Sequence, residues 1–413
     1  MSQIRSSDRA AEATGVSARI LEIDFIRGFM LISMALDHGT SLCRAMGRHA
    51  ASPITIAQVL PSTTAEIFFL MSGYLFGHTR LAKMTAVDRT FLGDTLKRTW
   101  QLYAYNAVTL LLVMAFMSLA SPTLLGAGRF DLFATDPFTA ARNFVLMRSA
   151  PFGFDVLQIY IIFFLATPLF AWLLLKSPSA ALAWLVTCWV AVGIWSRTIG
   201  LEHDETIAIN IWAWQITFFG GMWLGVGRRY AGIARVIVTD PRIFRGACLL
   251  LAVIAIGWIG QKYPHRMGLD ESPWILPGVD RATLGPLKIV SSLCVVVAMI
   301  WLADRFRIVE TQIGRALAML GRHSLACFCA SNFGLYWVAL AWQASGSHAV
   351  FWLAEGLFVA FIFGWVALVS TVMPAGSPKR KATPQPSAGA VDKDVATPDW
   401  TLTGHTHPVG GVR

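Results

Sequence analysis

Residues 154–175 read FDVLQIYIIFFLATPLFAWLLL, an apolar run with a single charged residue, Asp155. A helix needs roughly 20 mainly apolar residues to cross the hydrocarbon core of a bilayer, so this stretch predicts a transmembrane span. Nine further windows have the same character, at residues 23–42, 62–79, 99–120, 180–199, 210–227, 243–261, 285–303, 322–343 and 349–373. The sequence therefore predicts an all-α, polytopic membrane protein with about ten transmembrane helices.

The composition of the 413-residue chain agrees with this fold class. Hydrophobic residues make up 55% of the chain and charged residues 14%, with a mean hydropathy of +0.56. The net charge of +10 would suit a nucleic-acid-binding protein, but Lys and Arg are spread over connections beside apolar spans. Positive residues in short connections stay in the cytoplasm, and their distribution predicts that both termini lie there. We expect a multi-pass protein of the bacterial inner membrane, with the lipid bilayer and no nucleic acid as a partner.

The chain divides into three parts by composition. Residues 1–18 are polar and predict a cytoplasmic N-terminal segment, and residues 19–373 hold the spans. Residues 374–413 are rich in Pro, Gly, Thr and Ala without apolar periodicity, which predicts a disordered cytoplasmic tail. Five of the six cysteines fall in apolar spans, so no structural disulfide is expected.

The first span carries charged residues that a lipid-facing helix avoids, because a charge in hydrocarbon costs several kcal/mol unless it is paired or faces water. Arg27 and His38 are eleven residues apart, which places them on one helix face and about 16 Å apart along the axis. Asp24 lies one turn before Arg27 and can pair with it. The alternative is an interfacial ion pair together with a buried structural histidine.

Polar residues from other spans fall at the depths of His38 and Arg27. Those at the depth of His38 are Glu66, Asp155, Asn210, Gln215 and Lys288. Those at the depth of Arg27 are Arg80, Lys97, Arg98, Arg322, His323 and Ser324. Each can be a helix cap, a snorkelling anchor or a structural partner, but several at one depth beside a histidine favour a site. The lower layer would also suit an anionic ligand with a long thin arm, such as coenzyme A.

These residues carry a resemblance to a known family. Arg27 and His38, with ten residues between them in a first span, resemble the signature of the acyltransferase-3 superfamily. Five further motifs resemble the OpgC family more specifically: EIFFLMSGY at 66–74, DVLQIY at 155–160, NIWAWQ at 210–215, LGPLK at 284–288 and LGRHSL at 320–325. Proteins of that family are membrane succinyltransferases that act on osmoregulated periplasmic glucans. The resemblance covers roughly residues 19–372, in matching order.

The resemblance implies an O-acyltransferase that moves an acyl group, succinyl above all, from cytoplasmic succinyl-CoA to hydroxyls of a periplasmic glucan. The acyl-CoA would be a donor substrate, and no permanently bound cofactor and no metal are expected. Acetyl in place of succinyl stays open, as does another cell-surface polysaccharide as the acceptor, because fold similarity does not settle function. A transporter of an anionic compound is a further alternative, although the two halves show no internal repeat.

Site roles follow from the resemblance and from general chemistry. His38 would act as general base on the sugar hydroxyl, and Glu66 or Asp37 would orient its imidazole. Asp37 lies about 100° from the His38 face, so Glu66 is preferred. The residues implied for the acyl-CoA donor are Asp24, Arg27, Ser72, Tyr74, Arg322 and His323. Those implied for the acceptor or thioester pocket are Asp155, Gln158, Gln215 and Lys288.

Overall fold

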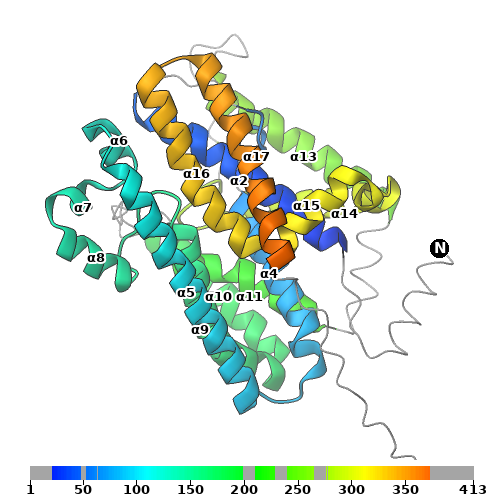
Figure 1. Ribbon diagram of the computed structural model, residues 1–413. Helices are drawn as coiled ribbons and strands as arrows, with labels where there is room; N and C mark the ends of the chain where they lie inside the picture. The colour runs from blue at the N-terminus through cyan, green and yellow to red at the C-terminus, as the bar shows by residue number, and fades with distance from the viewer. Residues whose placement is uncertain are drawn as a thin grey trace, which may run out of the picture. The chain divides into compact units, whose positions relative to one another are not determined.

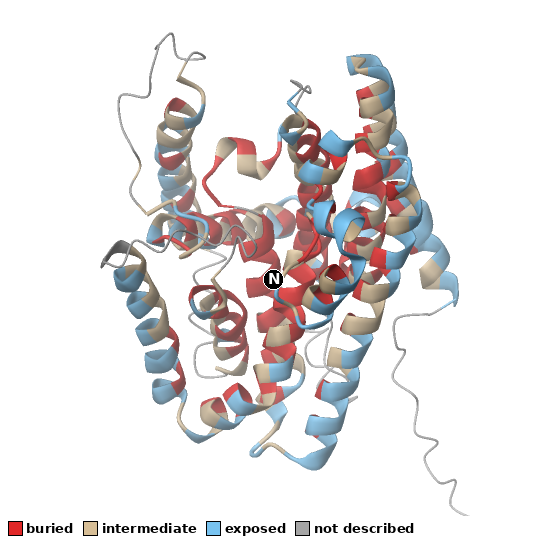
Figure 2. Ribbon diagram, turned by 90° about the vertical axis from the view of Figure 1, so that its left-hand side faces the viewer, coloured by how far each residue is buried: buried red, intermediate tan, exposed pale blue. Residues whose placement is uncertain are grey.

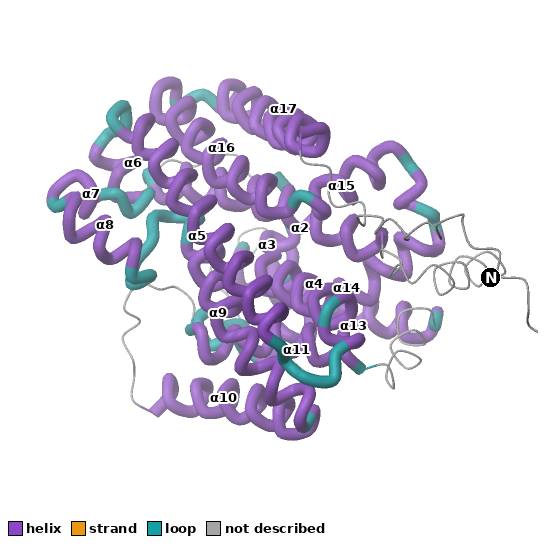
Figure 3. The backbone as a smooth tube through the Cα atoms, turned by 60° about the horizontal axis from the view of Figure 1, so that its bottom comes forward, coloured by secondary structure: helices purple, strands orange, loops and turns teal. Residues whose placement is uncertain are grey.

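The computed structural model describes residues 21–47, 53–62, 64–198, 210–227, 240–264, 276 and 278–372. Within these ranges the regular structure is helical and contains no strand, as Figure 3 shows. The described residues belong to one compact unit, Met1–Ala375. The all-α prediction is confirmed for this part of the chain, whereas the predicted N-terminal segment 1–18 and tail 374–413 lie outside the described residues.

Ten long helices coincide with the ten predicted windows (Figure 1). They are α2 (Leu21–Ala45), α4 (Thr64–Thr79), α5 (Arg89–Met117), α9 (Asp155–Lys176), α10 (Pro178–Thr198), α11 (Ile211–Val226), α13 (Pro241–Lys262), α14 (Pro286–Arg305), α16 (Ser324–Ser345) and α17 (His348–Val372). Seven helices of the described chain are long and apolar enough to cross a membrane, namely α5, α9, α10, α13, α14, α16 and α17. The structure therefore contains seven candidate spans, compared with about ten predicted.

The other three long helices lie in the interior. Helices α4 and α11 have 16 residues each, which is short for a span, and α2 has 25 residues but carries several charges. Most of α4 is buried, and so is much of α2 and α11. Figure 2 shows the same pattern, with buried residues gathered in the central helices and exposed residues on the peripheral ones. Because neighbouring helices cover these three, their sequences need not be uniformly apolar.

The remaining elements are short and were not predicted by any apolar window. They are α3 (Ile56–Val59), η1 (Leu81–Lys83), α6 (Pro122–Ala127), α7 (Asp131–Thr135), α8 (Pro137–Val145), η3 (Ile308–Glu310) and α15 (Gln312–Arg322). Helices α6, α7 and α8 occupy the connection between α5 and α9. Helix caps explain the starts of α6 and α8, since the side chains of Ser121 and Asp136 accept hydrogen bonds from Leu124 N and Thr139 N.

Helices α4 and α11 are joined by a glycine seam, which we define as Gly73, Gly77, Gly221 and Gly225. Each helix contributes two glycines four residues apart, so the backbones approach directly. A Cβ at Gly73 would lie 2.8 Å from the carbonyl carbon of Phe218, and a Cβ at Gly225 would lie 2.7 Å from a backbone nitrogen of α4. No side chain larger than hydrogen fits at these points, which fixes the register of α4 against α11.

Helix α15 packs on α2 through the same kind of close backbone contact at glycines. A Cβ at Gly28 would lie 2.8 Å from the carbonyl carbon of Leu317, and a Cβ at Gly321 would lie 2.7 Å from that of Asp24. The close approach brings the C-terminal end of α15 to the N-terminal end of α2. Arg322, the last residue of α15, is thereby placed beside the charged residues of the first predicted span.

Large apolar side chains are exposed on the peripheral helices. They include Leu111 on α5, Ile194 on α10, Leu249 on α13 and Leu353 on α17. Contiguous exposed apolar surface is unfavourable in water and favourable in lipid. Together with the seven candidate spans, this surface indicates a multi-pass membrane protein.

Candidate functional site

Charged side chains cluster at the N-terminal end of α2. Asp24 Oδ1 lies 3.7 Å from Arg27 Nη1, and Asp24 Oδ2 lies 3.6 Å from Arg322 Nε. Arg27 Nη2 also donates a hydrogen bond of 2.7 Å to Ser324 Oγ. Asp24 and Arg27 are buried, whereas Arg322 reaches solvent. The predicted Asp24–Arg27 pair is confirmed, and the packing of α15 adds Arg322 to it. We refer to Asp24, Arg27 and Arg322 as the arginine cluster.

A narrow crevice begins beside the arginine cluster. The guanidinium carbon of Arg27 lies 5.4 Å from the ring centroid of Phe68, and both Phe68 and Ser324 line the crevice. The other lining residues are Arg98, Leu102, Val156, Leu157, Tyr160, Leu325 and Phe328. Arg98 is the charged residue of this lining and is partly exposed, while most of the wall is apolar. The crevice therefore combines one guanidinium group with apolar side chains.

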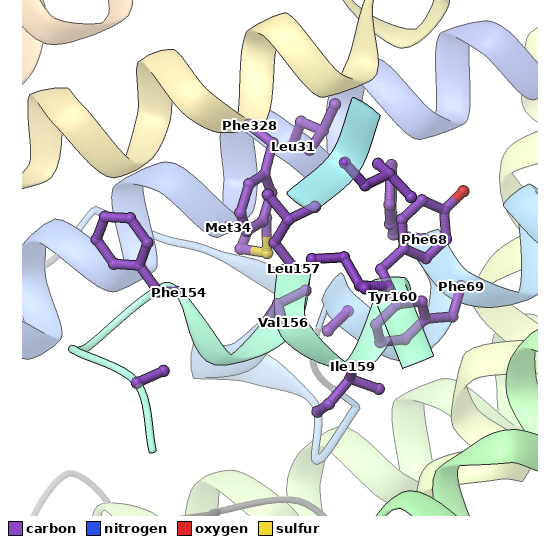
Figure 4. Packing of buried hydrophobic residues seen from close by; sticks show 14 of the residues in the cluster. Leu31, Met34, Phe68, Phe69, Phe154, Val156, Leu157, Ile159, Tyr160 and Phe328 are labelled. Carbon is purple, nitrogen blue, oxygen red and sulfur yellow. The ribbon is translucent and has the colours of Figure 1, made fainter. Parts of the chain in front are cut away.

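One face of α2 connects the arginine cluster to His38. Residues 27, 31, 34 and 38 follow one another at helical spacing and share that face. Figure 4 shows Leu31 and Met34 packed beside Leu157 and Phe328, two residues of the crevice wall. The middle of this face therefore packs against two residues that also line the crevice.

The His38 imidazole is partly buried near the C-terminal end of α2. Its ring meets the Phe152 ring edge-on, with the centroids 5.3 Å apart. The charged groups within electrostatic range of the imidazole are Asp37, Asp155 and Arg281. Partial burial leaves the histidine accessible to a ligand, and a carboxylate beside it can stabilise its charged form.

The segment that carries Phe152 is fixed by α16. The Tyr336 hydroxyl is buried and donates a hydrogen bond of 2.7 Å to the Phe152 carbonyl oxygen. Tyr336 also faces Asp155 and Arg129. Asp155 opens α9, where its Oδ1 accepts a hydrogen bond of 2.9 Å from Val156 N. The first turn of α9 thus supplies both a carboxylate near His38 and part of the crevice wall.

The two carboxylates predicted to orient His38 have other partners. Asp37 Oδ1 accepts hydrogen bonds from Thr55 Oγ1 at 3.2 Å and from Gln58 Nε2 at 3.4 Å. Glu66 Oε1 lies 3.1 Å from Lys288 Nζ. Among the described residues, Asp37 and Asp155 are the carboxylates found within electrostatic range of the imidazole. The sequence-based preference for Glu66 therefore finds no support in this geometry, because helical spacing does not reveal which neighbouring helix a residue meets.

Glu66 and Lys288 form a buried ion pair between α4 and α14. Both side chains are almost fully buried, and Lys288 Nζ also donates a hydrogen bond of 2.5 Å to the Pro61 carbonyl oxygen. One turn along α14, Ser291 Oγ lies 2.5 Å from Ser62 Oγ. These contacts tie the segment before α4 to the start of α14, so Lys288 has a structural role at this depth.

The predicted donor residues Ser72, Tyr74 and His323 lie in two places. Ser72 is buried on α4, and its Oγ has no hydrogen-bond partner among the described residues. The Tyr74 ring is stacked on His78 with centroids 5.9 Å apart, at the end of α4 that the glycine seam holds. His323 precedes α16 and is the neighbour of Ser324, the partner of Arg27. Of these three, His323 is the one adjacent to the arginine cluster.

Two predicted acceptor residues make local structural contacts. Gln158 Nε2 donates hydrogen bonds of 3.3 Å to the carbonyl oxygens of Phe144 and Ser149, which tie the end of α8 to α9. Gln215 Nε2 donates a hydrogen bond of 3.0 Å to the Trp212 carbonyl oxygen on its own helix. Both glutamines are buried, and neither is among the groups described around His38.

Four polar residues of this region escaped the sequence analysis. Arg129 and Arg281 lie in connections, and Tyr336 lies inside an apolar span. Glu355 lies on α17 with both carboxyl oxygens buried and without hydrogen-bond partners in the described part of the chain. Its Oε1 would lie 2.6 Å from a Cβ at Gly39, the residue after His38. A glutamate in an otherwise apolar span is a signal that could have identified it.

Comparison with known proteins gives one family. A model of the OpgC protein family matches residues 19–375, which is most of the chain and contains every residue of the arginine cluster, the crevice and the His38 region. No curated protein and no solved structure matched the chain.

Proposed function

Because the chain belongs to the OpgC protein family, we propose that it is a transmembrane O-acyltransferase that moves succinyl from cytoplasmic succinyl-CoA to hydroxyls of a periplasmic glucan. Membership of the family itself implies acyltransferase activity. One observation supports this proposal above the others: a single face of α2 carries Arg27 of the arginine cluster, which lies beside an apolar crevice, and a partly exposed histidine with carboxylates in electrostatic range.

The arginine cluster and Arg98 would bind the phosphorylated head of the donor. Guanidinium groups bind phosphate through paired, charge-assisted hydrogen bonds, and Arg98 and Arg322 are accessible from solvent. The pantetheine arm would then follow the crevice past Phe68 and Leu157. Arg27 and His38 are about 16 Å apart along α2, a separation that a long thin arm can span.

His38 would be the general base. As the sugar hydroxyl attacks the thioester carbonyl carbon, the imidazole accepts the hydroxyl proton and the new C–O bond forms. Collapse of the tetrahedral intermediate breaks the C–S bond, and the imidazolium returns the proton to the thiolate, which leaves as coenzyme A thiol. Asp155 would stabilise the imidazolium, with Asp37 as the second carboxylate nearby. The products are the glucan ester and free coenzyme A.

The proposed orientation places the arginine cluster at the cytoplasmic face and His38 toward the periplasm. It assigns α2, α4 and α11 as additional spans, for ten in all, with both termini in the cytoplasm of a bacterial inner-membrane protein. The distribution of Lys and Arg over the connections supports this orientation. Donor and acceptor would then reach the site from opposite sides of the bilayer.

Replacement of His38 tests the catalytic role. Purified His38→Ala should transfer acyl groups at least about 100-fold more slowly than the parent, because general-base catalysis contributes about that factor or more. His348→Ala, a histidine at the start of α17, is the matched control and should retain activity. Near-parental turnover of His38→Ala would show that the base is another group.

Arg27→Lys tests the donor site. Lysine keeps the charge but lacks the planar fork, so the apparent affinity for succinyl-CoA should fall while turnover at saturation changes little. Arg315→Lys, on the exposed face of α15, should leave the donor affinity unchanged. Equal donor affinities in all three proteins would reduce Arg27 to a structural partner of Asp24.

Sealed vesicles test the sidedness. In right-side-out vesicles that contain succinyl-CoA in the lumen, glucan added outside should become succinylated. Succinyl-CoA added outside together with glucan, with none in the lumen, should give no product. Product in the second arrangement, with intact vesicles, would contradict transfer across the bilayer. Acetylation from luminal acetyl-CoA, with no succinylation from luminal succinyl-CoA, would identify the chain as an acetyltransferase.

A further inference from the structure

Two arginines from separate connections border the His38 region. Arg281 lies within electrostatic range of the His38 imidazole, and Arg129 and Asp155 lie within electrostatic range of the Tyr336 hydroxyl. Both arginines are exposed, and neither side chain forms an ion pair or a hydrogen bond with another described residue. Neither side chain is therefore held by a polar contact within the described part of the chain. Their guanidinium groups are available to a ligand at the outer end of the site.

The connection that carries Arg281 is held in place from α11. Trp214 Nε1 donates a hydrogen bond of 2.8 Å to the Arg281 carbonyl oxygen, and Asn210 N donates one of 3.0 Å to the Ala282 carbonyl oxygen. Trp214 is fully buried, so this anchor is rigid. The backbone of Arg281 is therefore fixed while its side chain remains in solvent.

The turn that carries Arg129 is held in place from α16. Arg129 adopts φ +58°, a left-handed conformation that is strained for a non-glycine residue and persists where surrounding structure imposes it. The neighbouring Phe130 ring packs against Tyr336 with centroids 5.4 Å apart. The Gly128 carbonyl oxygen accepts a hydrogen bond of 3.0 Å from Phe152 N, the residue whose ring meets His38. A strained turn thus fixes an arginine beside the proposed catalytic region.

We propose that Arg281, assisted by Arg129, binds the free carboxylate of a dicarboxylic acyl group while the thioester carbonyl lies at His38. This inference rests on the proposed function. A succinyl group ends in an ionised carboxylate two methylenes beyond its carbonyl carbon, whereas an acetyl or butyryl group has no charge there. With the donor head at the arginine cluster and the thioester at His38, the acyl chain would lie at the end of the site that Arg281 and Arg129 border. These two arginines then select the acyl group.

Guanidinium groups suit this task better than the acids of the region. Asp37 and Asp155 would repel an anionic acyl chain, and the two arginines offset their charge. An Arg–carboxylate contact is charge-assisted and directional, so it discriminates by chemistry as well as by charge. A neutral glucan hydroxyl gains less from such a contact, which favours the acyl group over the acceptor as the ligand.

The test compares two donors of similar size with purified full-length protein and glucan: succinyl-CoA and butyryl-CoA, which carries a methyl group in place of the carboxylate. Arg281→Ala should lower kcat/KM for succinyl-CoA by about 10- to 100-fold, the loss expected for one hydrogen bond to a charged group. It should leave kcat/KM for butyryl-CoA unchanged. Arg281→Lys should retain part of the preference, and Arg129→Ala should show a smaller loss of the same kind. Arg148→Ala, an exposed arginine in the connection before α9, is the matched control and should change neither value.

Other outcomes overturn the proposal and identify the reason. Equal losses with both donors would assign Arg281 to the reaction or to glucan binding, and no loss in any arginine variant would exclude both arginines from acyl selection. Parental protein that uses the two donors equally well would also overturn it. Should Arg281→Ala fail to fold, Arg281→Lys and Arg129→Ala still report the donor preference. Failure of the proposed function itself looks different, because the parental protein would then transfer neither acyl group.

Discussion

Gly73→Ala is the substitution that tests the packing of the interior helices most directly. A methyl group at Gly73 would lie 2.8 Å from the Phe218 carbonyl carbon and 3.1 Å from Met222 N. The methyl group would lie closer still to the Phe218 carbonyl oxygen. Non-bonded carbon atoms rest at about 3.5–4.0 Å, and backbone atoms cannot rotate away, so α4 and α11 must separate by more than about 1 Å. Overpacking of this kind costs about 1–3 kcal/mol, toward the upper end here because the whole seam opens. Alanine regains roughly 1 kcal/mol of helix propensity, which leaves a net loss of about 2 kcal/mol.

Thermal unfolding of the purified protein in detergent measures this loss. Gly193→Ala on α10 and Gly364→Ala on α17 are the controls, because a methyl group at either position meets open space. Gly73→Ala should unfold at a clearly lower temperature than the parent, and both controls should unfold at the same or a higher temperature. Adding Gly77→Ala should cost less than it does alone, since the helices are already apart. If Gly73→Ala were as stable as Gly193→Ala, α4 and α11 would not be in direct backbone contact.

Three further predictions concern polar groups in the spans. Lys288→Met should lower the free energy of unfolding by about 3–5 kcal/mol, because it removes the cation beside the buried Glu66 carboxylate. Adding Glu66→Gln to the same chain should recover much of this loss. Simply additive losses in the double variant would show that the ion pair does not contribute to stability. Tyr336→Phe should cost about 0.5–1.5 kcal/mol of stability and slow acyl transfer, because it frees the Phe152 carbonyl beside the site; unchanged turnover would refute this positioning role. Glu355→Leu should leave the unfolding temperature unchanged or raise it, since the carboxyl oxygens of Glu355 have no hydrogen-bond partner among the described residues. A large drop in the unfolding temperature would contradict this and reveal an essential partner of the carboxylate.

The sequence was informative about the long helices and less so about the short ones. Long apolar stretches in the sequence mark helices, and each predicted apolar window coincides with one. This holds even for the interior helix α4, which has only 16 residues. Helix α15 was missed because it is short and has a polar face, yet it delivers Arg322 to the arginine cluster. The pair of Asp24 and Arg27 was predictable because it lies within one helical turn.

Local geometry along the chain therefore determined the fold class, the position of the helices and the charged face of α2 that carries Arg27 and His38. Only the tertiary structure decided which carboxylate meets the histidine, because that depends on how α4, α9 and α14 are arranged around α2. Packing of α14 against α4 places Lys288 beside Glu66, and α9 brings Asp155 within electrostatic range of His38, which helical spacing did not reveal. Spacing along one helix specifies depth and direction, whereas the partner found in that direction is chosen by the packing of helices far apart in sequence.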